Sequence, residues 1–132
     1  MGVVMTLDQF AALAACTVLA GLAVFQGALI SGAPLGQLAW GGQHKVLPTG
    51  LRIGSALSIV LYAVFGYAAA AEAGLMLPLV NESVTSILIW VLTAYFALGV
   101  IMNGISRSKP ERLVMTPTAI VLTALFLILA LG

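Results

Sequence analysis

The chain has 132 residues, of which 62% are hydrophobic and 7% are charged, and its formal net charge is +1. Soluble domains carry about 25% charged residues, so this composition excludes a water-facing surface and makes lipid the expected solvent. The small net charge also provides no broad basic field of the kind that attracts nucleic acid, and we expect no nucleic-acid partner.

Four apolar runs follow one another along the chain. Each is close to the roughly 20 residues that a helix needs to cross about 30 Å of hydrocarbon. Helices are the expected form, because lipid offers no partner for unpaired backbone groups and the runs lack the alternation of barrel strands. The expected spans are residues 10–30, 53–71, 84–105 and 113–131. We therefore predict an all-α membrane protein, with residues 1–132 forming a single four-helix transmembrane domain.

The two halves of the chain resemble each other weakly. Gly27–Gly32, at the end of the first run, aligns with Gly99–Gly104 at the end of the third. Ile59–Phe65 in the second run aligns with Ile120–Phe126 in the fourth. These matches predict two similar helical hairpins in a parallel repeat, with extra length in the connection of the first hairpin.

All five basic residues lie in or beside two of the three connections. Lys45 and Arg52 belong to the first, and Arg107, Lys109 and Arg112 belong to the third. Cytoplasmic loops of membrane proteins carry an excess of Lys and Arg. We therefore expect a multi-pass protein of the cell membrane, with the first and third connections in the cytoplasm and both termini outside.

The first connection, from Gly32 to Arg52, has an unusual composition. Its five glycines and two prolines indicate defined turns more than a flexible linker. One interpretation is a headgroup or phosphate site, in which backbone amides and cations hold an anion at the membrane interface. The alternative is a folded interfacial cap, with Trp40 anchored and Lys45 reaching the headgroups.

Polar residues near the ends of the first and third runs extend this candidate site. Gln26 and Asn103 are amides that either hydrogen-bond across helices or line a polar vestibule. The third connection either sets the topology or joins the first around one anionic group. The candidate ligand-binding residues are Gln26, Trp40, Gln43, His44, Lys45, Arg52, Asn103, Arg107 and Arg112.

Residues typical of catalysis or metal binding are scarce. The chain has one His and one Cys, and no Cys/His pair has the spacing of zinc ligands. We predict no catalytic residues, no metal site and no cofactor. Trp90 and Tyr95 lie well inside the third run, and we expect them to pack between helices.

Three functions fit these features. The first is a small non-catalytic transporter, channel or binding module for a small molecule or lipid, with its site at the cytoplasmic face. The second is an accessory subunit or assembly factor of a larger membrane complex. The third is an interfacial lipid-modifying enzyme, although the lack of an acid/base pair makes an enzyme the less favoured reading. The expected partners are membrane lipid, an anionic headgroup or small molecule, and either further copies of the chain or another membrane protein.

Overall fold

The computed structural model describes residues 4–132, and in this part of the chain it is helical with no strand. The long helices are α1 (Leu7–Ile30), α2 (Thr49–Glu72), α3 (Glu82–Gly104) and α4 (Lys109–Leu131). All four are long and apolar enough to cross a membrane. The predicted four-helix membrane bundle is thereby confirmed. Residues 1–3 of the predicted domain lie outside the described part.

Side-chain caps fix where three of the helices begin. Thr6 and Gln9 form a reciprocal capping box at the start of α1. The Asn81 side chain accepts a hydrogen bond from the Val84 amide at the start of α3, at 2.9 Å. Ser108 caps α4. Each cap satisfies an amide that the first turn of a helix leaves unpaired.

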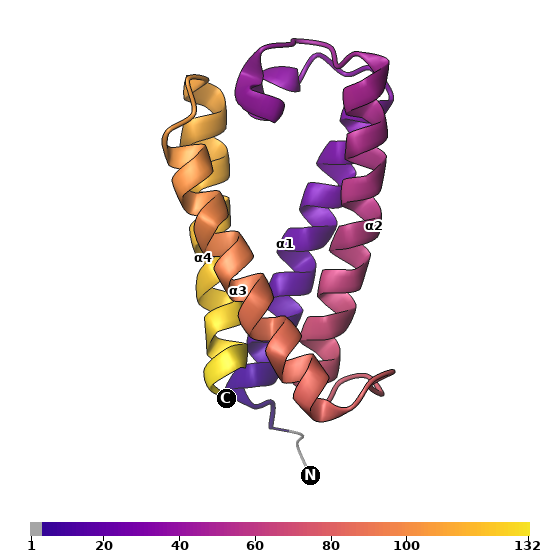
Figure 1. Ribbon diagram of the computed structural model, residues 1–132, viewed down its shortest axis with the longest axis vertical. Coiled ribbons are helices and arrows are strands. Elements are labelled where there is room, and N and C mark those ends of the chain that lie inside the picture. Colours follow the sequence, from indigo (N-terminus) through magenta and orange to yellow (C-terminus); the bar gives the residue numbers. More distant parts are fainter. Residues whose placement is uncertain (1–3) are drawn as a thin grey trace.

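The helices form two hairpins, α1–α2 and α3–α4, which pack as a ring in which α1 also contacts α4 and α2 contacts α3. Figure 1 shows the start of α1 and the C-terminus at the same end as the α2–α3 connection, with the other two connections at the opposite end. The hairpins meet near the termini and spread apart toward the opposite end. We call that opposite end the basic end, because it carries all five Lys and Arg residues.

The tightest packing lies between the hairpins toward the termini. Alanines of α1 and α2 let the helices approach closely there, and larger side chains of α3 and α4 fill the remaining space. The fully or almost fully buried members are Ala11, Ala12, Ala15, Ala69, Ile89, Leu122, Phe126 and Leu129. This packed end holds the two hairpins together while they diverge toward the basic end.

One sequence expectation about α3 is wrong. Trp90 is 47% exposed and Tyr95 is 53% exposed, so neither is enclosed between helices. Almost half of the Trp90 surface is open on α3, as suits a ring that faces lipid in a membrane helix. Tyr95 has one face against the Phe65 ring of α2, at a centroid distance of 5.8 Å, and the rest of it remains open.

Candidate functional site

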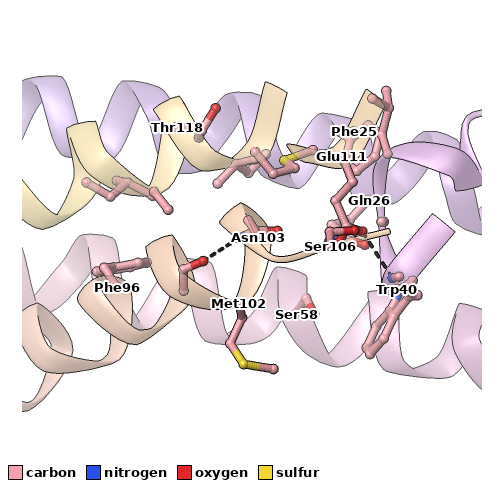
Figure 2. A pocket seen from close by; sticks show the side chains of 18 of the residues that line it. Phe25, Gln26, Trp40, Ser58, Phe96, Met102, Asn103, Ser106, Glu111 and Thr118 are labelled. Atoms are coloured by element: carbon pink, nitrogen blue, oxygen red, sulfur yellow. Dashed lines mark hydrogen bonds between the residues drawn. The ribbon is translucent and has the colours of Figure 1, made fainter. Parts of the chain in front are cut away.

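The spreading hairpins enclose a cavity of about 610 Å³ that reaches the basic end. We call it the inter-hairpin cavity. Residues from all four helices and from the first connection line it, and Figure 2 shows the side chains of many of them. Aromatic rings make up much of the wall: Phe25, Trp40, Tyr62, Tyr95 and Phe96. Its size and apolar lining are those of small-molecule sites in proteins.

An aromatic cluster forms the floor of the inter-hairpin cavity. Phe96 lies at a centroid distance of 5.3 Å from Tyr95 and 5.0 Å from Phe126. Phe65 approaches Phe96 edge to face at 5.9 Å. These tilted and edge-to-face geometries are the favoured ones for aromatic pairs. The cluster separates the cavity from the packed end of the bundle.

Gln26 of α1 places a polar group deep in this apolar wall. Only 7% of the residue is exposed. Its Nε2 atom donates to the Tyr62 hydroxyl of α2 at 3.3 Å, which ties the two helices of the hairpin together. Its Oε1 atom is buried and has no hydrogen-bond partner. A buried acceptor without a partner costs about 1–3 kcal/mol, so a donor in the cavity, from water or from a ligand, would stabilise this group.

Asn103, near the end of α3, also lines the inter-hairpin cavity. Its Nδ2 atom donates to the backbone oxygen of Gly99 at 2.8 Å. Figure 2 shows this bond, with Phe96 and Thr118 toward one end of the cavity and Gln26, Trp40 and Glu111 toward the other. Gln26 and Glu111, the two polar residues of the wall that are almost fully buried, therefore lie toward the same end.

Glu111 is the charged group most deeply set in the wall, with 6% of it exposed. It belongs to the first turn of α4, where the partial positive charge of a helix start favours a carboxylate. The Gly41 amide of the first connection donates to its Oε2 atom at 3.0 Å. Ser108 and Glu111 have the spacing of a capping box, but here the carboxylate turns away from the Ser108 amide and binds the other loop.

The first connection, residues 31–48, is folded and docked on α4. Gly41 and Gly42 have φ values of +78° and +73°, which only glycine adopts without cost. The Ser108 hydroxyl donates to the Gln37 backbone oxygen at 2.5 Å. A Cβ atom at Gly42 would overlap the Cβ and Oγ atoms of Ser108. The loop therefore covers part of the basic end of the cavity through close contacts that depend on glycine.

Trp40 projects from this loop against α2. Its φ value is +52°, which is rare and costly for a bulky residue. Its Nε1 atom donates to the buried Ser55 hydroxyl at 3.2 Å. A Cβ atom at Gly54 would lie 2.9 Å from the indole, so the glycine makes room for the ring. The docked indole holds the strained backbone in place and contributes to the cavity wall.

The wall differs in exposure from one helix to another. Some lining residues of α1 and α4 are almost fully buried, such as Gln26 at 7% and Leu122 at 2%, and others are half-buried, such as Phe25 and Met115. Three lining residues of α3 are more than half exposed, namely Leu98 at 56%, Met102 at 59% and Tyr95 at 53%, whereas Phe96 is buried. The most exposed helical residues of the cavity lining thus belong to α3.

Of the nine residues predicted to bind a ligand, four line the inter-hairpin cavity: Gln26, Trp40, Asn103 and Arg107. Arg107 is exposed and lies at the rim. Gln43, His44 and Lys45 are exposed on the first connection and do not line the cavity.

The two remaining predicted cations bind backbone oxygens outside the cavity lining. Arg52 donates to the oxygens of Leu47 at 2.8 Å and Ile30 at 3.4 Å. Arg112 donates to the oxygen of Ser106 at 3.0 Å. These guanidinium groups secure the ends of helices and loops, and the structure does not gather the predicted cations around one point.

Glu111 and Tyr62 are wall residues that the sequence analysis did not select. For Glu111 a signal existed, since it is the only acid near the basic connections and follows Ser108 at capping-box spacing. The inward direction of its carboxylate depends on the path of a loop far away in the sequence. Tyr62 has no comparable signal among the other aromatic residues.

The described residues contain no group of three or more His, Cys, Asp or Glu side chains that would hold a metal ion. The chain matches no protein-family model, no curated protein and no solved structure. The geometry of the inter-hairpin cavity is therefore the basis for the functional argument.

Proposed function

We propose that this protein binds a small, mostly apolar molecule with one polar end in the inter-hairpin cavity. The observation that carries the proposal is the Gln26 Oε1 atom, an unpartnered acceptor buried in a cavity of about 610 Å³. Apolar sites with a few convergent polar groups are the usual form of ligand sites. The polar end would meet Gln26, and the apolar body would contact the aromatic floor.

The aromatic cluster favours a binding site over an open channel. Phe65, Phe96 and Phe126 are all buried and pack against one another below the cavity. A permeating molecule would have to displace this cluster and the packed alanines beyond it. We further propose that the basic end faces the cytoplasm, in keeping with the distribution of Lys and Arg.

Native mass spectrometry of the protein released from its own membrane tests this proposal. Ser58 of α2 lines the cavity, and its hydroxyl bonds only to its own helix, at the Gly54 oxygen. Ser58→Phe should therefore fill the cavity at little cost to folding. Ala56, on the exposed face of the same helix, provides the control Ala56→Phe.

The expected result is a bound small molecule in the unaltered protein and in Ala56→Phe, and its loss in Ser58→Phe. The same occupant at the same level in Ser58→Phe would show that it binds elsewhere. An empty unaltered protein would count equally against the proposal.

A further inference from the structure

Several polar side chains line the inter-hairpin cavity, and some of their donors are already in use. Five side-chain donors of the wall are bonded to the protein. Asn103 Nδ2 donates to Gly99, Gln26 Nε2 to Tyr62, Trp40 Nε1 to Ser55, Ser58 Oγ to Gly54 and Thr118 Oγ1 to Val114. The hydroxyls of Tyr62, Tyr95 and Ser106 and the Arg107 guanidinium are further donors in the lining, and of these Tyr95 and Arg107 are exposed.

Three acceptor side chains in the wall have oxygens that the protein leaves free or only partly bonded. Gln26 Oε1 is buried without a partner. The Asn103 amide has its nitrogen on Gly99, and no described residue donates to its oxygen. Glu111 has two carboxylate oxygens, and its partner across the loop is a single neutral amide at Gly41. Gln26, Asn103 and Glu111 therefore present acceptor oxygens that a bound molecule with N–H or O–H groups can use.

The charge of Glu111 also favours a ligand that donates hydrogen bonds. Among the described residues it forms no ion pair, although it is almost fully buried. Arg107 lies at the exposed rim, and the Arg112 guanidinium is bonded to the Ser106 oxygen. The start of α4 and the Gly41 amide partly offset the charge, whereas a buried carboxylate is normally paired with a cation.

Aromatic rings are the third feature of the inter-hairpin cavity that bears on the class of its ligand. Five of them line the same cavity as Glu111, including Trp40, Tyr62 and Tyr95. The face of an aromatic ring attracts a cation electrostatically, most strongly where water is excluded. A carboxylate, free acceptors and aromatic faces are together suited to one class of ligand.

We infer that the molecule bound in the inter-hairpin cavity carries a protonated amine, whose N–H groups bind Glu111 and the free amide oxygens, on an apolar body. This inference rests on the proposed function and specifies its ligand class. It departs from the anionic ligand that the basic connections suggest, because Arg52 and Arg112 are bonded to backbone oxygens outside the lining, and Arg107, which does line the cavity, is exposed at its rim.

The test compares four probes of similar shape by equilibrium dialysis against the protein in phosphatidylcholine nanodiscs. They are naphthylethylammonium, its trimethylammonium analogue, the neutral naphthylethanol and the anionic naphthylpropanoate. Specific binding is defined as the part that Ser58→Phe abolishes, which removes simple partition into lipid. Glu111→Gln keeps an oxygen for the Gly41 amide but removes the charge. Glu82→Gln, in the exposed first turn of α3, is the matched control.

Naphthylethylammonium should bind tightest, and Glu111→Gln should weaken it at least about tenfold, with Glu82→Gln unchanged. The Gly41–Glu111 contact should persist in Glu111→Gln, seen as unchanged hydrogen exchange of the loop. Equal binding of the trimethylammonium analogue would overturn the assigned N–H donors. Specific binding of the alcohol or the anion as tight as that of the amine, or an unchanged Glu111→Gln, would overturn the inference and leave the proposed function standing. If Ser58→Phe abolished the binding of no probe and retained the native occupant, both proposals would fail.

Discussion

Replacement of Gly42 by alanine should release the first connection from α4. The new Cβ atom would overlap the Cβ and Oγ atoms of Ser108. Ser108 cannot move aside freely, because its side chain caps α4. The loop is the part able to move, and its movement would break the contacts of Gly41 with Glu111 and of Ser108 with Gln37.

The structure gives the size of this effect. A hydrogen bond to a charged group is worth about 1.5–3 kcal/mol, and one between neutral groups about 1 kcal/mol. Their loss together costs about 2.5–4 kcal/mol. An alanine at positive φ adds about 1–2 kcal/mol. Gly41→Ala isolates this last contribution, because Gly41 has φ +78° and a Cβ atom there would meet nothing within 4 Å.

Hydrogen exchange measured by mass spectrometry is the appropriate assay, since the opening is local to the loop. Peptides covering residues 36–48 should exchange about 100-fold faster in Gly42→Ala than in Gly41→Ala, because each 1.4 kcal/mol is a factor of ten. Peptides from the packed end of the bundle should be unaffected in both variants. Equal exchange in the two variants would refute the idea that contact with Ser108 holds the loop.

Two further predictions concern the basic end. Arg52→Ala removes two bonds to backbone oxygens and should lower the free energy of unfolding by about 1.5–3 kcal/mol, measured as a lower thermal midpoint. Naphthylethylammonium should still bind to this variant with its original affinity. Lost affinity at unchanged stability would make Arg52 a ligand-binding residue instead. Single cysteines introduced at Ser108 and at Asn81 in a cysteine-free background should be labelled from opposite sides of the membrane. An impermeant reagent on intact cells should reach only the cysteine at position 81. Labelling at position 108 would reverse the proposed orientation.

Local sequence determines most of the fold. Span length and the scarcity of charge predict four membrane helices, because the cost of unpaired backbone in lipid leaves no other form. The position of Asn81 and Ser83 between Pro78 and the third run makes both of them candidate caps, and the structure uses Asn81. Trp90 could not be placed, because a tryptophan suits both a lipid-facing surface and a helix contact, and the choice depends on how the helix is rotated.

The candidate site is less accessible to sequence reasoning. Gln26 and Asn103 could be selected from the sequence, because an amide side chain is conspicuous within an apolar run. The Gly41–Glu111 contact joins residues that are 70 positions apart, and it forms only because glycines at positive φ turn the loop back over α4. The basic residues attract attention by their charge, yet Arg52 satisfies its donors on nearby carbonyl groups. The basic residues of the sequence thus indicate which end of the bundle they lie at, but they do not indicate which residues bind a ligand.

The exposed α3 residues of the cavity lining bear on how a ligand reaches the inter-hairpin cavity. Leu98 and Met102 line the cavity and are more than half exposed on α3, a helix long and apolar enough to lie within the membrane. We expect a ligand to enter past these side chains from the bilayer, without first entering water. Its effective concentration at the protein is then fixed by its partition into lipid, so the apparent dissociation constant in aqueous units will rise as the lipid-to-protein ratio of the assay increases.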